Sequence, residues 1–70
     1  MTAACLQGTQ LIKANLNRAK LDGADLTGAD LMGAQLVNAD LSNANLSQTK
    51  LYRTNLSGAV LLGAILQLRI

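Results

Sequence analysis

The stretch LDGADLTGADLMGAQLVNADL, residues 21–41, carries leucine at every fifth position. A small residue stands two places before each leucine, and an aspartate or an amide usually lies between them. The same spacing continues in both directions through thirteen consecutive leucines, from Leu6 to Leu66. A repeat that covers nearly the whole chain predicts a single domain over residues 1–70. We expect the repeats to span about residues 4–68, with residues 69–70 marking the end of the pattern.

A period of five fits neither common secondary structure. On a helix, five residues turn the side chain by about 140°, so the leucines would spiral around the surface. On a straight strand, successive leucines would point to opposite faces. All leucines can face one core only if the chain bends once per repeat. Gly or Asn stands two residues after most leucines, where a tight turn needs a positive φ. The pattern therefore predicts a solenoid wound around its own leucines.

The charged residues indicate how many repeats make one coil. With four repeats per coil, Lys20 lies over Asp40 and Asp30 lies over Lys50, and both are favourable opposite-charge pairs. With three repeats per coil, Asp25 would lie over Asp40. A four-sided coil is therefore the better interpretation.

The repeat resembles the pentapeptide-repeat family, whose motif reads A(D/N)LXX. ADL at residues 24–26, 29–31 and 39–41, and ANL at residues 14–16 and 44–46, match this motif directly. The resemblance implies an all-β fold, a right-handed quadrilateral β-helix of about three coils. It also implies that the leucine and the small residue before it point inward, while the other three positions point outward.

The composition limits both the core and the chemistry. Half of the residues are hydrophobic, but Tyr52 is the only aromatic one, so we expect a narrow and uniform core. Cys5 is the only cysteine, which excludes an internal disulfide. It is either a small buried apolar residue, the interpretation that we favour, or a thiol at the end of the chain. One cysteine and no histidine argue against a transition-metal site, and we expect no cofactor.

The polar residues argue against several functions. The four acids (Asp22, Asp25, Asp30 and Asp40) stand at outward repeat positions, so we interpret them as surface charges and expect no enzyme activity. Six scattered basic residues and a net charge of +2 do not predict nucleic-acid binding. No apolar run is long enough to span a membrane, and no secretory signal is visible, which favours the cytoplasm.

Two surfaces are candidates for contact with other proteins. The first is an outward apolar stripe with a basic rim; its residues are Ile12, Met32, Tyr52, Lys13, Lys50 and Arg53. The second is the C-terminal end, where apolar residues accumulate; they are Val60, Leu62, Ile65, Leu68 and Ile70. An open solenoid end needs a cover. We expect an identical end of another molecule to cover it, which gives a homodimer, although a missing further segment would explain the same residues.

The leading functional hypothesis is a non-catalytic structural or protein-interaction module, a rigid rod that presents flat faces to a protein partner. The alternative comes from the family resemblance alone, which implies DNA mimicry and modulation of a type II topoisomerase such as gyrase. Such mimicry needs a long acidic rod, whereas this chain is short and net basic. A minimal repeat module without any partner is a further alternative.

Overall fold

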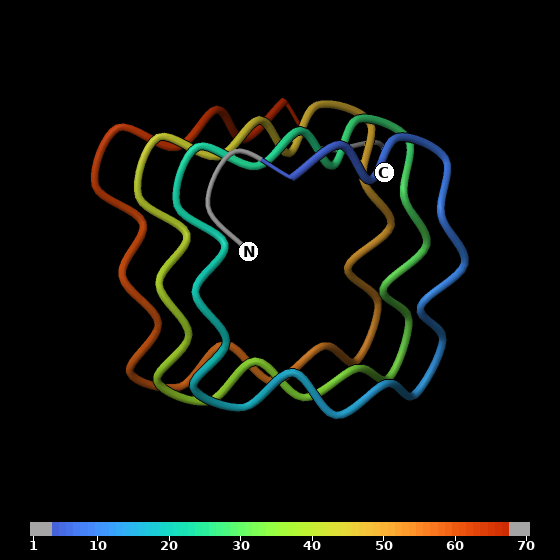
Figure 1. Cartoon of the computed structure of the whole chain (residues 1–70). Coiled ribbons are helices and arrows are strands. Elements are labelled where there is room, and N and C mark those ends of the chain that lie inside the picture. Colours follow the sequence, from blue (N-terminus) through green and yellow to red (C-terminus); the bar gives the residue numbers. More distant parts are fainter. Residues whose placement is uncertain (1–3, 68–70) are drawn as a thin grey trace.

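The computed structural model describes residues 4–67, which wind as a four-sided coil around a common axis (Figure 1). Nine parallel β-bridges join residues that are twenty positions apart, among them Cys5–Asp25, Lys20–Asp40 and Asp30–Lys50. Four repeats therefore make one coil, as the charge columns predict. Within the described range each face contributes isolated bridge residues and no longer strand or helix, so the fold has no element bounds beyond the bridges.

Each repeat turns a corner directly after its leucine. The N–H of the third residue after the leucine donates to the leucine carbonyl, for example from Ala29 to Leu26 at 2.9 Å and from Thr9 to Leu6 at 3.2 Å. The second residue after the leucine has a positive φ in every one of these turns, which is the signature of a type II turn. The prediction of Gly and Asn at the corners is confirmed.

Four corners carry residues that the sequence did not mark as turn residues: Lys13, Arg18, Gln48 and Arg53, with φ between 57° and 63°. A side chain with a Cβ seldom adopts this conformation. At Lys13, Arg18 and Gln48 the hydrogen bonds of the coil hold this conformation in place, because the N–H at the corner donates to the next coil. Lys13 donates to the Met32 carbonyl at 2.9 Å, and Gln48 donates to the Gln67 carbonyl at 2.7 Å.

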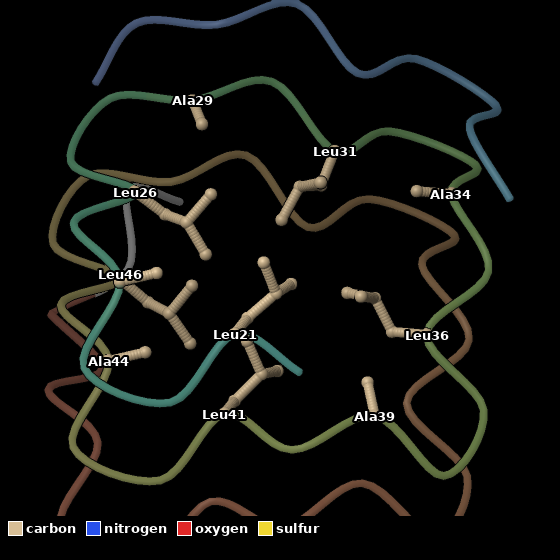
Figure 2. Close-up of a cluster of buried hydrophobic side chains, with 11 residues drawn as sticks. Leu21, Leu26, Ala29, Leu31, Ala34, Leu36, Ala39, Leu41, Ala44 and Leu46 are labelled. Carbon is tan, nitrogen blue, oxygen red and sulfur yellow. The ribbon is translucent and has the colours of Figure 1, made fainter. Parts of the chain in front are cut away.

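The core is built from the inward leucine and the inward small residue of each repeat (Figure 2). The six leucines from Leu21 to Leu46 and the five alanines from Ala24 to Ala44 are completely buried. Leucines of the first and last coils are only half-buried, and Leu66 is 44% exposed. The middle of the stack therefore carries most of the hydrophobic stabilisation, because only there does each side chain have a coil on both sides.

Threonine replaces alanine at some inward positions and uses its hydroxyl. Thr49 is fully buried, and its Oγ1 donates to the Leu26 carbonyl at 2.8 Å. Thr54 does the same toward the Leu31 carbonyl at 2.6 Å. Each hydroxyl donates to a carbonyl of the preceding coil, so this polar group has a hydrogen-bond partner within the core and the coil does not need to be wider.

The aspartate or asparagine before the leucine closes the turn from outside. Its side-chain oxygen accepts a hydrogen bond from the backbone N–H two residues later, as at Asp25, Asp30, Asp40, Asn15, Asn45 and Asn55. This N–H would otherwise have no partner in the repeat, which gives a physical reason for the D/N position of the motif.

Gln35 stands at the same repeat position as these aspartates and asparagines, but the N–H two residues after it finds a different acceptor. The N–H of Val37 donates to Oδ1 of Asn17 in the preceding coil at 2.9 Å, while Nδ2 of Asn17 donates to Gln35 at 3.0 Å. Oδ1 of Asn15 and Oδ1 of Asn55, in the same column as Gln35, each accept a hydrogen bond from a backbone N–H of their own turn. The three stacked amide side chains therefore do not all bond to one another.

Two expectations need correction. The described residues measure 22 × 19 × 17 Å, so they form a block that is nearly as wide as it is long and not a rod. Cys5 is exposed and is not a buried core residue. It occupies the outward position before Leu6 and forms a bridge with Asp25, where another repeat would carry Asp or Asn.

Candidate protein-interaction surfaces

The apolar stripe lies along one corner of the block. We call Ile12, Met32 and Tyr52 the Tyr52 edge. Their turns stack in register, because Lys13 donates to the carbonyl of Met32 at 2.9 Å and Gly33 donates to the carbonyl of Tyr52 at 2.8 Å. The three side chains are 45%, 37% and 65% exposed. The structure therefore brings these residues together, at an edge between two faces instead of on a flat face.

The basic residues predicted beside the stripe take different positions. Lys13 and Arg53 lie at the same turn position in the first and third coils, next to the Tyr52 edge. The Arg53 guanidinium lies 5.4 Å from the centre of the Tyr52 ring, within cation–π range. Lys50 forms a bridge with Asp30, so its charge has an acidic neighbour on the coil below. The edge thus joins an apolar strip to two cationic side chains.

Gly33 is a part of this edge that sequence reasoning missed. It lies between Lys13 and Arg53 in the same corner column, with a φ of +69°. A Cβ at Gly33 would come within 3.3 Å of Cγ of Lys13, so the lysine stem extends over the glycine. The twenty-residue offset among corner positions is the signal that could have identified it.

The C-terminal end exposes a second apolar group. Val60 and Ile65 are each 47% exposed, and Leu62 is 80% exposed. Val60 forms a bridge with Asp40 and Ile65 with Asn45, so both apolar side chains continue columns that are polar in the preceding coil. Leu66, at 44%, adds to this surface and was not among the predicted residues. Leu68 and Ile70 lie outside the described residues.

The carboxylates of Asp25 and Asp40 act as hydrogen-bond acceptors within the fold. The pKa of Asp25 is lowered by the hydroxyl of Thr27, by the Gln7 amide and by the Thr27 backbone N–H. The pKa of Asp40 is lowered by the hydroxyl and the backbone N–H of Ser42, with a further contribution from the charge of Lys20. Each of these bonds favours the ionised form, so the acids are held as anions by their own turns.

These two acids predict a loss of stability in acid. Their folded-state pKa values lie below the ordinary value, so their stabilisation is complete above the unfolded pKa of about 4 and disappears as the pH falls through the folded pKa. We expect the free energy of unfolding to decrease from about pH 5 toward about pH 2. Urea unfolding at a series of pH values would measure this dependence.

The matched control is the double variant Asp25→Asn/Asp40→Asn. Asparagine closes the same turn at Asn45, whose Oδ1 accepts from the Ser47 N–H at 3.0 Å, so the variant keeps its caps without titrating. It should show a flatter pH dependence than the wild type. An equally steep decline in both proteins would assign the acid sensitivity to other groups.

Within residues 4–67, no group of three or more Cys, Asp or Glu side chains is placed to hold a metal ion. In the same range the structure contains no helix that is long and apolar enough to cross a membrane. On the described surfaces, outward residues that are twenty positions apart stack in columns along the coil axis.

These features define a class of protein, the right-handed quadrilateral β-helix, in which five-residue repeats stack around a leucine core. The sequence model of pentapeptide repeats matches residues 4–43 and 39–67, with eight copies of the repeat. The chain belongs to the pentapeptide-repeat family, which confirms the resemblance and the predicted fold.

Two solved structures are similar to this chain. The pentapeptide-repeat protein Rfr23 from the cyanobacterium Cyanothece 51142 is 35% identical, with a TM-score of 0.85 over 97% of this chain and 44% of its own. HetL from Nostoc sp. strain PCC 7120, a pentapeptide-repeat protein involved in the regulation of heterocyst differentiation, is 38% identical, with a TM-score of 0.57 over 97% of this chain and 37% of its own. The chain therefore spans less than half the length of either structure. No functionally curated protein matches it.

Proposed function

We propose that this chain is a non-catalytic protein-interaction module and that the Tyr52 edge is its contact surface. The observation that carries the proposal is the alignment of Ile12, Met32 and Tyr52 in one exposed column. Large apolar side chains with an aromatic anchor and a neighbouring arginine are the residues that contribute most to protein interfaces. Because the solenoid already fixes their backbone, binding would need to order only the side chains.

The charges along the edge define the kind of partner. Lys13 and Arg53 lie beside the apolar column, and the Arg53 guanidinium covers part of the Tyr52 ring. A protein surface with an apolar centre and acidic residues on its rim would complement this arrangement. The involvement of HetL in regulation is compatible with a protein-binding role for this fold.

The shape argues against the DNA-mimic alternative. DNA mimicry requires a rod with regular negative charge. The described residues form a block of 22 × 19 × 17 Å, the net charge is +2, and Lys20 and Lys50 interrupt the aspartate columns at Asp40 and Asp30. We therefore favour a protein partner over a topoisomerase bound through DNA mimicry.

The proposal predicts that two charges on the Tyr52 edge abolish partner binding. We expect the wild type to capture a partner from lysate of its source cells and Met32→Glu/Tyr52→Glu to lose it, because the new carboxylates must be desolvated at the interface and oppose an acidic rim. Mass spectrometry of the captured proteins would measure the loss. Both side chains are exposed, so circular dichroism should show that the variant is folded.

A matched control is Val37→Glu/Ser57→Glu, which places the same charges in the same two coils on the neighbouring corner. It should capture the partner as the wild type does. Equal loss in both variants would point to net charge instead of the edge, and equal capture by the wild type and the Met32→Glu/Tyr52→Glu variant would exclude the Tyr52 edge.

The C-terminal end supports a second proposal, self-association. Val60, Leu62 and Ile65 form an apolar surface at the last coil, and Leu66 extends it. Covering such a surface with another molecule removes apolar area from water. The homodimer predicted from the sequence is one form of this self-association. The direction of the backbone N–H and C=O groups at the two ends of the solenoid distinguishes it from other arrangements.

A further inference from the structure

The backbone hydrogen bonds between coils are asymmetric. In each repeat, the N–H of the leucine and the N–H two residues later both point to the following coil, as in Leu26 to the Asn45 carbonyl at 2.8 Å and Gly28 to the Ser47 carbonyl at 2.9 Å. Only one carbonyl of the repeat points that way, as when Ala24 accepts from the Asn45 N–H at 2.9 Å. Two donors and one acceptor therefore face the C-terminal side, and one donor and two acceptors face the N-terminal side.

The two open edges of the solenoid consequently have opposite polarity. Within residues 4–67, the groups that the hydrogen bonds leave unpaired at the C-terminal edge include the N–H groups of Arg53, Leu56, Gly58, Leu61, Gly63 and Leu66, and the carbonyls of Thr54, Ala59 and Ala64. At the N-terminal edge of the same range they leave the N–H groups of Cys5, Gln10 and Asn15, and the carbonyls of Cys5, Gln7, Gln10, Ile12, Asn15 and Asn17. One edge is rich in donors and the other is rich in acceptors.

We propose that the C-terminal edge of one molecule binds the N-terminal edge of a second copy of this chain, so that the solenoid continues head to tail. In this arrangement each surplus donor meets a surplus acceptor, with the geometry that the coils already use within one molecule. A symmetric dimer of two C-terminal ends would instead bring surplus donors against surplus donors, and an N–H group removed from water without an acceptor is unfavourable. The backbone polarity therefore disfavours the two-fold dimer that the apolar end suggests.

The residues at the corners indicate how the second copy is rotated about the coil axis relative to the first. Residues 62–67 already occupy the first face of a fourth coil, so a second copy in direct line would place its first repeat where Leu66 lies. It would also place Lys13 over Arg53, which is a like-charge contact. A half-turn about the axis avoids both of these contacts.

The half-turn register also suits the side chains at the contact. Leu6 and Leu11 of the second copy then lie over Leu56 and Leu61, whose open sides are only half-buried in one molecule. Lys13 of the second copy then lies over the uncharged Gly63 and not over Arg53. All four faces carry the same backbone pattern. The half-turn therefore places the N–H groups of Leu56, Gly58, Leu61 and Gly63 against the carbonyls of Cys5, Gln7, Gln10 and Ile12 of the second copy.

The test uses one blocking substitution at each end. Ala14 lies in the first coil and Ala64 in the last, both inward and half-buried, and the two face each other across the proposed contact. Ala14→Lys should block the N-terminal edge, and Ala64→Lys should block the C-terminal edge. Sedimentation velocity over a wide range of protein concentration would measure the assembly size of each variant, of their equimolar mixture and of the wild type.

Head-to-tail stacking predicts wild-type assemblies that grow beyond a dimer with concentration, since such a contact does not close. Each variant alone should be monomeric, and their mixture should stop at one-to-one pairs, because one good edge remains on each partner. A symmetric C-terminal dimer predicts instead that Ala14→Lys dimerises like the wild type, alone and in the mixture, and that Ala64→Lys stays monomeric in both, so that no mixed pairs form; this result would overturn the proposal.

Sedimentation velocity of the wild type tests head-to-tail stacking even if a lysine variant fails to fold. A wild type that stops at a dimer, or that stays monomeric up to millimolar concentration, overturns head-to-tail stacking. The inference is independent of the Tyr52 edge. Met32→Glu/Tyr52→Glu should therefore assemble as the wild type does, even if it captures no partner.

Discussion

Replacing Leu36 with alanine should lower the free energy of unfolding by about 2–5 kcal/mol, the range for buried leucines whose removal leaves a cavity. Leu36 is fully buried in the middle coil, and its column continues with Leu16 below and Leu56 above. The backbone around it is fixed by inter-coil bonds, such as that from Leu36 N–H to the Asn55 carbonyl at 2.8 Å. The cavity therefore has little freedom to collapse. Urea unfolding followed by circular dichroism would measure the loss.

The control for this prediction is Leu56→Ala in the last coil. Leu56 occupies the same column but is only half-buried, so its removal opens no closed cavity and should cost clearly less. A loss below about 1 kcal/mol at Leu36 would contradict a core that depends on the middle coil. So would equal losses at the two positions.

Enlarging the small inward residue should also be destabilising. We expect Ala39→Leu to cost about 1–3 kcal/mol, because extra methylene groups in a filled core displace its neighbours. Ala39 is completely buried, and its side chain points into the core of the middle coil between Leu36 and Leu41 (Figure 2). The same unfolding experiment measures this cost.

Ala59→Leu is its matched control. Ala59 lies one coil above Ala39 in the same column and is only half-buried, so the larger side chain can turn toward the open end. The substitution there should be nearly neutral, or stabilising if it covers the exposed tops of Leu56 and Leu61. Similar destabilisation at both positions would mean that the width of the coil, and not the closed middle layer, limits the size of this residue.

Family membership and fold could be predicted from the sequence because one period decides both. A leucine at every fifth residue admits no helix and no straight strand, and the pairs Lys20–Asp40 and Asp30–Lys50 select the four-sided coil. The alignment of the Tyr52 edge followed from the same offset of twenty. Its position at a corner could have been inferred as well, because each of its residues directly precedes the residue that the Gly and Asn pattern marks as the corner.

Other features of the structure could not be predicted from residue types or motifs, or were predicted wrongly, and each has a physical reason. Residue type gives no sign that Lys13, Arg18, Gln48 and Arg53 adopt a positive φ, because local propensity opposes it. Only their place two residues after a leucine marks them as corners, and at Lys13, Arg18 and Gln48 a bond to the next coil holds this conformation. Cys5 was misassigned because its hydrophobicity was weighed ahead of its place in the repeat. The hydrogen bond from the Val37 N–H to Oδ1 of Asn17 joins residues twenty positions apart, and no sequence motif predicts it.

The sequence by itself determined the period, the number of repeats per coil and the identity of the core residues, since these depend only on spacing and hydrophobicity. Tertiary structure alone decided which leucines are fully buried, because burial requires a coil on both sides. It also decided the polarity of the two edges. That polarity resides in the direction of backbone N–H and C=O groups, which every residue type shares and which only the winding of the chain orients.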